Sequence, residues 1–541
     1  MSPATNLIGR ILLIAVLLLC TCALALSAQV PMHVFQGGPT LENYGREVCA
    51  AGDVNGDGHA DIAISAPDDD GSGPGRIEIR SGRDGSLLHE LLGTAPGDEY
   101  GAHLAPLGDL DGDGQPELIV ASANGKVVDV LSGRTFAAIH HYQLPPGPVT
   151  MGWGLADVGD MDGDGRHDFS IAGSEGDAIG FVSIMSGGSG ALLLLKHGSK
   201  PGDLFGTNVA GAGDVNGDGH PDFLVKRNQA DIYFQGFVSC FSGQDGSLLG
   251  TLGGGNIGTS MGAVGDLDGD GGDEVILGAP QFQSPHFTGP GYALVYSWKT
   301  NTTLFEFTGE LSSDDFGYRV GGLGDVDADG VADFFITSLY AIPDAGSGLG
   351  KAFVRSGADG SLLFSVEGQA GNGNLGGCAA AAGDVDGDGR CDLIVGARDG
   401  SALLPSGHDG YVAVHVIAPP FTWAGLGLAG TLPAPILYGL GTLQPASVTE
   451  IGLNGALPGA AGTLIAGFAA IDAPFKGGTL VPLPQVLVPL PPVGPDGHLQ
   501  LVGHWPPGLP AGTPLYLQAW LADALGPAGF AASNALEAVT P

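Results

Sequence analysis

The sequence is poor in positive charge, with 19 lysine and arginine residues against 58 aspartate and glutamate residues and a formal net charge of −39. A protein that binds nucleic acid needs a basic face to meet the phosphates, so this balance argues against nucleic acid as a partner. Helical periodicity is also lacking, and short apolar runs alternate with turns rich in glycine, of which there are 97. This composition predicts many short strands rather than long helices.

Cysteine is scarce as well. Of six cysteines, two fall in the N-terminal apolar run, which leaves Cys49, Cys240, Cys378 and Cys391. So few cysteines in so long a chain do not make a disulfide framework, and we expect most of them to be small buried hydrophobic residues. A Cys49–Cys378 disulfide remains as the alternative to two buried thiols, because both residues fall on the same kind of strand.

Long hydrophobic runs are lacking after the first residues. The run ILLIAVLLLCTCALAL (11–26) follows Arg10 and precedes small residues, which predicts a secretory signal peptide over residues 1–28, cut between Ala25 and Gln29. An uncleaved membrane anchor is the alternative, but the run is short for a bilayer span. Bulky Leu19 before Cys20 disfavours a lipoprotein anchor. We therefore expect a secreted, extracellular or cell-surface protein, soluble and without a membrane span after cleavage.

The sequence does contain a repeated acidic stretch. GDVNGDGHAD (52–61) returns six times, and the first aspartates of successive copies are 51 to 59 residues apart. Each copy follows a segment of small residues such as REVCAA and precedes an apolar run such as DIAISA, an alternating strand and a last short strand. Four antiparallel strands in each of seven units predict an all-β fold, a seven-bladed β-propeller over residues 31–417.

The two ends of the repeat array complement each other. The seventh unit ends at GYVAVHV (410–416) without a fourth strand, whereas the segment PMHVFQGG (31–38) resembles the missing one. We expect this N-terminal strand to close the last blade. Beyond residue 420 the charge falls to five acids and one base, and apolar segments (462–471, 479–490 and 513–522) alternate with Pro/Gly turns. Residues 420–541 therefore predict a C-terminal β-sandwich-like domain.

The acidic stretches read D-x-[DN]-x-D-G-x-x-[DE], with side-chain oxygens at positions one, three, five and nine. Glycine at position six suits a sharp turn around an ion, and hard oxygen ligands in a flexible loop favour Ca²⁺ over Mg²⁺ or zinc. The loops are not EF-hands, because position twelve of the first is Ile64 rather than glutamate. A metal-free loop held by Asx turns is the alternative. We predict up to seven Ca²⁺ ions.

The predicted calcium ligands are, blade by blade, Asp53, Asn55, Asp57 and Asp61; Asp109, Asp111, Asp113 and Glu117; Asp160, Asp162, Asp164 and Asp168; Asp214, Asn216, Asp218 and Asp222; Asp266, Asp268, Asp270 and Glu274; Asp325, Asp327, Asp329 and Asp333; and Asp384, Asp386, Asp388 and Asp392.

Two-residue marks, each a large residue followed by glycine, precede the loops and resemble those of a known family. These marks are Tyr44-Gly45, Tyr100-Gly101, Trp153-Gly154, Phe205-Gly206, Met261-Gly262 and Phe316-Gly317. With the calcium loops, they make residues 31–417 resemble the FG-GAP repeats of the integrin α-subunit propeller and of bacterial secreted proteins. The resemblance implies an extracellular adhesion or ligand-binding platform for a protein or glycan partner, without naming the ligand.

An extracellular hydrolase or lyase acting on polysaccharide or phosphodiester is the alternative function. Neither Gly-x-Ser-x-Gly nor His-Glu-x-x-His occurs, and His59, His167 and His220 lie within the calcium loops, where they resemble exposed scaffold. No catalytic constellation emerges, so we expect a binding protein rather than an enzyme.

Long loops in blades four to six (226–236, 279–291 and 338–350) predict the ligand-binding face, opposite the calcium loops. Aromatic rings on loops anchor partners well. The alternative is that these rings pack down onto neighbouring blades. The predicted ligand-binding residues are Tyr233, Phe234, Phe282, Phe287 and Tyr340, with His286 and the rare cations Lys226 and Arg227 beside them.

Overall fold

The computed structural model describes residues 31–37, 43–68, 71, 73–122, 127–143, 150–174, 179–229, 235–281, 289–311, 314–327, 329–342, 349–368, 374–397, 410–417, 421–425, 436–440, 448–454, 456–475, 478–482, 484–493, 499–504, 514–524 and 530–539. The chain divides into two compact units, Val30–Ala418 and Pro419–Pro541. The predicted signal peptide lies outside the described residues. Within them, no helix is long and apolar enough to cross a membrane.

The first unit consists of seven four-stranded antiparallel sheets. Blade one is β2 (Val48–Gly52), β3 (Asp61–Ala66), β4 (Arg76–Arg80) and β5 (Leu87–Leu92); blade two is β6 (Tyr100–Pro106), β7 (Leu118–Ser122), β8 (Val127–Leu131) and β9 (Ala138–Gln143); blade three is β10 (Thr150–Gly159), β11 (Asp168–Ser174), β12 (Gly180–Met185) and β13 (Leu192–His197). Blade four is β14 (Asn208–Gly213), β15 (Asp222–Gln229), β16 (Gln235–Phe241) and β17 (Leu248–Gly253); blade five is β18 (Ser260–Gly265), β19 (Glu274–Ala279), β20 (Tyr292–Ser297) and β21 (Thr302–Thr308). Blade six is β22 (Val320–Gly324), β23 (Asp333–Ile342), β24 (Leu349–Arg355) and β25 (Leu362–Glu367); blade seven is β26 (Leu375–Gly383), β27 (Asp392–Ala397), β28 (Tyr411–His415) and β1 (His33–Gln36).

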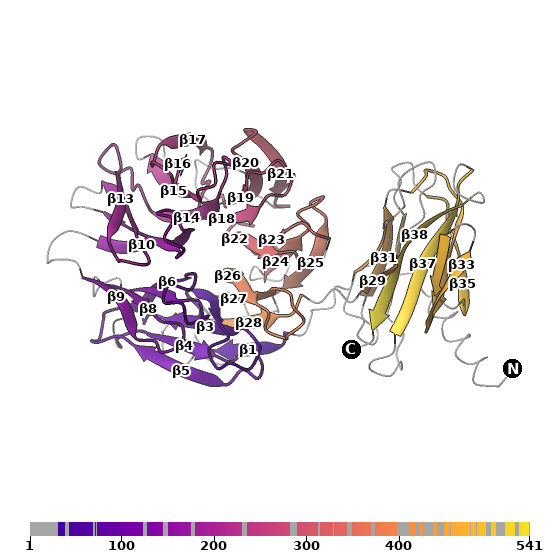
Figure 1. Ribbon diagram of the computed structural model, residues 1–541, viewed down its shortest axis with the longest axis horizontal. Coiled ribbons are helices and arrows are strands. Elements are labelled where there is room, and N and C mark those ends of the chain that lie inside the picture. The colour runs from indigo at the N-terminus through magenta and orange to yellow at the C-terminus, as the bar shows by residue number, and fades with distance from the viewer. Residues whose placement is uncertain are drawn as a thin grey trace. The chain divides into compact units, whose positions relative to one another are not determined.

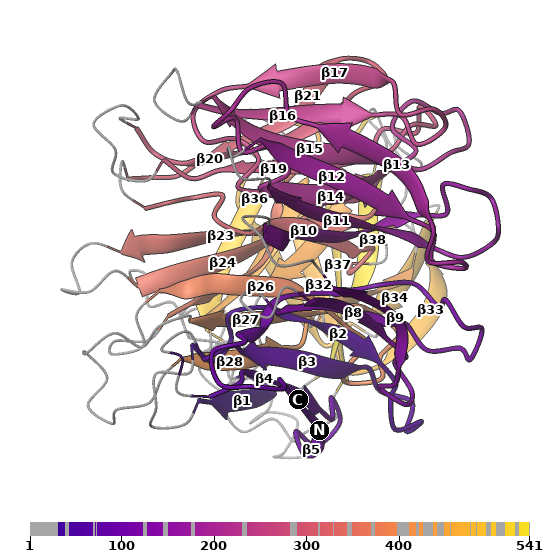
Figure 2. The ribbon, with the colours of Figure 1, turned by 90° about the vertical axis from the view of Figure 1, so that its left-hand side faces the viewer.

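The sheets form a closed ring, as Figure 1 shows, with β14, β18 and β22 towards its centre. The first strand of each blade contacts the first strand of the next all the way round, including β26 of blade seven with β2 of blade one. Blade three, at the left of the ring in Figure 1, faces the viewer in Figure 2. The N-terminal strand β1 pairs with β28, from His33 opposite Val414 to Gln36 opposite Tyr411. The predicted propeller and its closing strand are therefore confirmed.

Burial changes in a regular way from the axis to the rim. The first strands are rich in small residues, which allow the blades to crowd together, as VCAAG does in β2. Some also carry larger residues, such as Tyr100 and His103 in β6. The second strands are the most buried, as in DIAISA of β3, which is buried at every position because both of its faces meet neighbouring blades. The ends of the longer second strands β15 and β23 are partly exposed, at Arg227 and Tyr340. The fourth strands, such as β5, are largely exposed. The predicted order of strands within each repeat follows this gradient.

Three of the four described cysteines are buried: Cys49, Cys240 and Cys378. Cys49 packs with Ile77 and Leu118 between blades one and two, whereas Cys378 packs with Ile62 and Val412 in a different cluster. Cys49 and Cys378 are thus two buried thiols rather than a disulfide.

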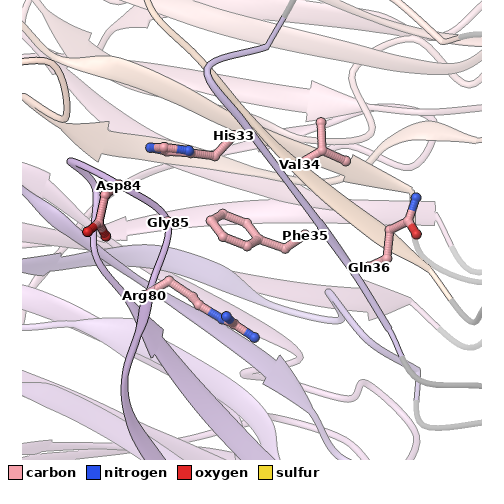
Figure 3. A pocket seen from close by; sticks show the side chains of 7 residues that line it. All are labelled: His33, Val34, Phe35, Gln36, Arg80, Asp84 and Gly85. Carbon is pink, nitrogen blue, oxygen red and sulfur yellow. The ribbon is translucent and has the colours of Figure 1, made fainter.

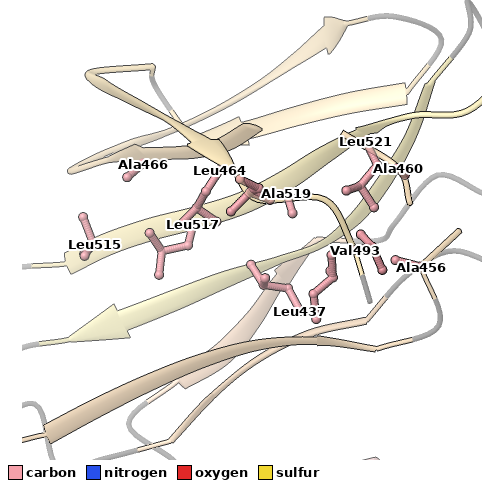
Figure 4. Close-up of a cluster of buried hydrophobic side chains, with 12 residues drawn as sticks. Leu437, Ala456, Ala460, Leu464, Ala466, Val493, Leu515, Leu517, Ala519 and Leu521 are labelled. Carbon is pink, nitrogen blue, oxygen red and sulfur yellow. The ribbon is translucent and has the colours of Figure 1, made fainter. Parts of the chain in front are cut away.

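The second unit is a β-sandwich-like domain. Its five-stranded sheet runs β29 (Phe421–Gly425), β38 (Phe530–Val539), β37 (Pro514–Ala522), β32 (Gly462–Gly467) and β35 (Val486–Leu490). Its three-stranded sheet runs β30 (Ile436–Leu440), β31 (Val448–Asn454) and β36 (Leu499–His504), and β33 (Ala470–Phe475) pairs with β34 (Gly478–Pro482). Leu437 and Leu453 of the smaller sheet pack with Leu464 and Leu517 of the larger one in a shared core, drawn in Figure 4.

Candidate metal centres

The seven acidic loops share one internal hydrogen-bond pattern. Each loop joins the first and second strands of its blade, so all seven lie on one face of the ring. In every loop the first aspartate accepts the N–H of the sixth-position glycine, at 2.7 to 3.0 Å. The fifth-position aspartate accepts the N–H of position seven, and the ninth-position acid accepts the N–H of position two. The side chains are thereby turned inward around the loop.

The sixth-position glycine is required by the backbone. Gly58 has a φ of 88° and Gly219 a φ of 89°, a left-handed conformation that other residues adopt only with strain. This turn directs the N–H of position six at the first aspartate and brings the acids together.

An apolar residue at position two also holds each loop in place, a feature that the sequence analysis did not identify. Leu110, Val215, Val326 and Val385 are at most 1% exposed. The side chain of Val385 in blade seven reaches the turn glycine Gly82 of blade one. Valine, leucine or methionine occupies position two in all seven loops, and that regularity was the available signal.

The ninth-position acid is completely buried and anchors the loop to the rest of its blade. In blades one, three, four and six its second oxygen accepts the N–H of the glycine that begins the turn between the third and fourth strands, as Asp61 does from Gly82 at 3.0 Å. Blades two and five carry glutamate instead. The buried Oε1 atoms of Glu117 and Glu274 have no hydrogen-bond partner.

Burial raises the pKa of these ninth-position carboxyl groups, and repulsion from neighbouring acids adds to the effect. The pKa of Asp61 rises to about 6, and those of Asp222, Asp392 and Glu117 rise to about 7. A carboxylate with a raised pKa is stabilised by a nearby cation, because the cation offsets both desolvation and repulsion. The sites are therefore electrostatically prepared for a positive ion.

Carboxylate oxygens converge in five of the seven loops, where they lie within 4.8 Å of one another. The groups are Asp109, Asp111, Asp113 and Glu117; Asp160, Asp162 and Asp168; Asp266, Asp268 and Glu274; Asp325, Asp327 and Asp333; and Asp384, Asp386 and Asp392. These acids could hold a metal ion. The buried, partnerless oxygens of Glu117 and Glu274 fit a hard divalent cation, which prefers carboxylate oxygen.

The loops of blades one and four differ at position three, where they carry Asn55 and Asn216. The Asn55 side-chain amide donates to Asp57 at 3.2 Å, and Asn216 donates to Asp218 at 3.0 Å. An amide thus relieves part of the repulsion between acids in these two loops. Their ninth-position acids, Asp61 and Asp222, remain buried.

Two of the predicted marks before the loops were placed wrongly. The structurally required residue is a glycine with positive φ that precedes the first aspartate by eight residues, as Gly45 (φ 78°) precedes Asp53. In blades three and five this glycine is Gly152 (φ 88°) and Gly258 (φ 83°), so the marks are Met151-Gly152 and Ile257-Gly258 rather than Trp153-Gly154 and Met261-Gly262. The constant spacing of eight residues could have identified them.

The histidines of the first and third loops contact oxygen atoms, and the contact of the first reaches a neighbouring blade. His59 Nδ1 lies 2.9 Å from the Val385 carbonyl oxygen of blade seven, and His167 Nδ1 lies 2.8 Å from Asp157 Oδ2. His59 is therefore a contact between blades rather than exposed scaffold.

Most of the predicted ligand-binding residues, namely Tyr233, Phe234, Phe282 and Phe287 with His286, lie outside the described residues. Tyr340 is described; it is 39% exposed and belongs to strand β23. Lys226 and Arg227 are not loop residues, because β15 continues to Gln229. Lys226 is only 7% exposed, and the Arg227 guanidinium stacks 4.4 Å from the ring centroid of Phe237.

Family models match the repeats directly. The FG-GAP-like repeat matches residues 109–171, and the FG-GAP repeat matches residues 44–77, 205–241 and 377–415. Integrin alpha-PS2 of Drosophila melanogaster is 31% identical over 215 residues, which is 34% of this chain and 15% of that protein. Integrin alpha-8 of Gallus gallus is 26% identical over 277 residues, which is 44% of this chain and 24% of that protein.

A solved crystal structure of BBS1N in complex with ARL6DN aligns with 72% of this chain and 98% of its own chain, at 11% identity and a TM-score of 0.44. The chain spans less than a quarter of the length of the integrin relatives named above. The chain therefore carries FG-GAP repeats and is similar, over part of its length, to integrin α chains.

Proposed function

We propose that this chain is a secreted calcium-binding β-propeller that serves as an extracellular adhesion or ligand-binding protein, with Ca²⁺ in the loops stabilising the blades. One observation carries the calcium part of the proposal. Acids that burial and repulsion would otherwise destabilise converge within 4.8 Å in loop after loop, and two buried carboxylate oxygens have no protein partner. Similarity to integrin α chains supports the adhesion part.

Calcium would be held by the side-chain oxygens at positions one, three, five and nine of each loop, which belong to acids except at Asn55 and Asn216. Since the ninth acid also bonds the turn between the third and fourth strands in blades such as blade one, an ion at this point supports both of the turns at this end of the blade. Calcium titration by calorimetry, together with a chelator control, tests this step directly. A chain that takes up no calcium would contradict the proposal.

The ligand would bind on the face opposite the calcium loops, at blades four to six. Tyr340 supports this placement, because a tyrosine that is 39% exposed offers both an apolar ring and a hydroxyl to a partner. A binding array of glycans and matrix proteins in calcium would identify the ligand. The triple variant Tyr233→Ala, Phe287→Ala and Tyr340→Ala is expected to lose binding and to keep the calcium-dependent melting temperature.

Leu92→Ala is the matched control, because Leu92 is 60% exposed on strand β5 at the rim of the ring. Unchanged binding in the triple variant would contradict the placement of the ligand. The same purified protein is also applied to a panel of polysaccharides. Hydrolysis or cleavage that one substitution outside the loops abolishes would favour the enzyme alternative. N-terminal sequencing of exported protein tests secretion, with a start between Ala25 and Gln29 expected.

A further inference from the structure

The acidic loop of blade seven differs from the others in what its ninth residue holds. In blades such as blade one, the second oxygen of that acid bonds a glycine in the covalent turn between the third and fourth strands. Blade seven has no such turn, because its fourth strand is β1. Asp392 Oδ1 instead accepts the N–H of Ile417 at 2.9 Å, two residues after β28 ends.

This bond fixes the end of the strand that carries the closing strand. β28 pairs with β1 along its length, and Met32 N donates to the Val414 carbonyl oxygen at 2.8 Å. In the other blades a short turn keeps the fourth strand beside the third even when their hydrogen bonds open. Strand β1 is held beside β28 by non-covalent contacts alone, and the chain joins it to β2 of blade one rather than to β28. When those contacts open, no short turn keeps β1 near β28, so it gains more conformational freedom than a fourth strand that follows such a turn.

The same loop also joins blade seven to blade one. Ala60 N donates to the Asp384 carbonyl oxygen at 2.7 Å, and His59 Nδ1 meets the Val385 carbonyl oxygen at 2.9 Å. The loop thus contacts the neighbouring blade at the seam where the ring closes.

Strand β1 bridges this seam from the outside. His33 Nε2 lies 2.6 Å from the Gly82 carbonyl oxygen, and the Arg80 guanidinium lies 5.4 Å from the ring centroid of Phe35. His33, Phe35 and Arg80 line a hollow of about 350 Å³. Figure 3 shows these side chains. Gly82 is also the residue whose N–H bonds Asp61 of the first loop. The closing strand therefore contacts Gly82, which loop one holds, and pairs with β28, whose end is held by loop seven.

We propose that the acidic loop of blade seven, residues 384–392, is a calcium-dependent latch on the closing strand β1. The proposal rests on the calcium binding proposed above. Calcium among Asp384, Asp386 and Asp392 offsets their mutual repulsion and fixes Asp392, and with it Ile417 and the end of β28. In blades one, three, four and six the same ion would fix a turn that already joins the third and fourth strands covalently, so its loss leaves the fourth strand attached.

Hydrogen–deuterium exchange of the full chain tests the latch with two matched variants, Asp386→Ala in loop seven and Asp162→Ala in loop three. Each removes the third-position carboxylate and one hydrogen bond, from Asp388 N at 3.0 Å or from Asp164 N at 3.1 Å. In saturating calcium, Asp386→Ala is expected to speed exchange over residues 31–37 and 411–417 at least about tenfold. Asp162→Ala is expected to leave those segments within about twofold of the wild type and to loosen residues 180–197.

A milder variant keeps the test available if Asp386→Ala does not fold. Asp386→Asn copies the asparagine that loops one and four carry at position three, so the turn is compatible with it. It is expected to raise the calcium concentration at which residues 31–37 become protected by at least about threefold, because fewer ligand charges weaken calcium binding. An unchanged concentration contradicts the latch.

The latch is overturned if Asp162→Ala loosens residues 31–37 as much as Asp386→Ala does, or if neither variant loosens them. Calcium uptake by the wild type separates this failure from failure of the proposed function. If the wild type takes up no calcium, both proposals fall. If it takes up calcium and chelation leaves residues 31–37 protected, the latch alone falls.

Discussion

Arg319 joins blade six to blade one, since its Nη2 donates to both carboxylate oxygens of Glu47 at 3.0 and 3.2 Å. Its Nε also points to the Gly377 carbonyl oxygen of blade seven, at 3.4 Å. The two residues immediately precede the first strands of their blades, so the ion pair lies at the inner end of the ring, on the face opposite the acidic loops. The neighbouring carboxylate raises the pKa of Arg319, which keeps the guanidinium charged.

Arg319→Met is expected to lower the free energy of unfolding by about 1 kcal/mol, because both side chains are partly exposed and the ion pair is screened by water. Denaturant melts in low and high salt measure the effect, which shrinks as salt rises. Arg83→Met, on an exposed turn of blade one, is the control and is expected to have no measurable effect. A double-mutant cycle with Glu47→Gln isolates the pair, and additive losses would contradict the coupling.

Calcium removal is expected to lower the melting temperature of the propeller sharply. Extracellular calcium modules bind at roughly 10⁻⁴–10⁻³ M. At a free concentration tenfold above Kd, one site stabilises by about 1.4 kcal/mol, so seven independent sites sum to roughly 10 kcal/mol, or roughly 10 °C for a unit of this size. Differential scanning calorimetry with calcium or EGTA measures the shift. An unchanged melt would exclude calcium as a source of stability.

The pH dependence of stability is expected to change sign with calcium. In the calcium-free protein burial raises the pKa values of the ninth-position acids Asp61, Asp222 and Asp392 to about 6 to 7, so the stability they contribute is present at low pH and is lost as pH rises towards and through that range. With calcium, protons compete with the ion for the same oxygens, so stability rises with pH.

The buried His415 has the opposite effect on the pH dependence of stability from that of the acids. Burial lowers its pKa to about 4, so its contribution is present above its ordinary pKa and is lost as pH falls. One histidine is outnumbered by the ninth-position acids, and the calcium-free protein is therefore expected to melt higher at about pH 5 than at about pH 7.5. Thermal melts of calcium-stripped and calcium-loaded protein over this pH range measure how the melting temperature depends on pH in each state. If the melting temperature changes in the same direction with pH in both states, the predicted change of sign is wrong.

Glu117→Gln is expected to separate the two roles of a ninth-position acid. Without calcium, it removes a charge that burial and neighbouring acids destabilise, so the melting temperature rises or stays level. With calcium, the substitution removes a ligand, so calorimetry is expected to find one calcium site fewer, or one calcium site with weaker affinity. The exposed Asp84→Asn, outside the loops, is the control. Equal calcium binding by Glu117→Gln and wild type would remove Glu117 from the site.

Reducing agent is expected to leave the melting temperature unchanged. Cys49 and Cys378 are buried thiols in different hydrophobic clusters, and burial raises the pKa of the Cys49 thiol, which disfavours its reactive form. Peptide mapping without reduction checks this, and a peptide that links the two cysteines would contradict it.

The blades and the closing strand could be predicted because their determinants are local and repeated. Period-two alternation and the glycine and aspartate turns mark each strand, and the unpartnered segments at the two ends of the array complement each other. The acidic loops could be predicted for the same reason, since all the predicted calcium ligands of one loop lie within nine residues.

The remaining features depend on packing rather than on local pattern. The marks in blades three and five were placed wrongly because a glycine after a large residue, as in Trp153-Gly154 and Met261-Gly262, does not by itself indicate a left-handed backbone. The structure requires a left-handed glycine at fixed spacing, and Ile257 before Gly258 is buried without being aromatic. Lys226 was assigned to a loop because it begins a polar run, although ladder pairing with Val238 extends β15. Arg319 and Glu47 are 272 residues apart, and the sequence around each residue does not indicate that the other is its partner.

The position of β1 dictates the order in which the propeller can be completed. This strand is synthesised before every other strand of the ring, yet its partner β28 is the last to be made. During synthesis, β1 must stay unpaired while more than twenty strands form behind it, which exposes a free strand edge to wrong partners. The ring therefore closes only after the whole propeller has been produced, and a nascent chain stopped within blade seven holds an open ring.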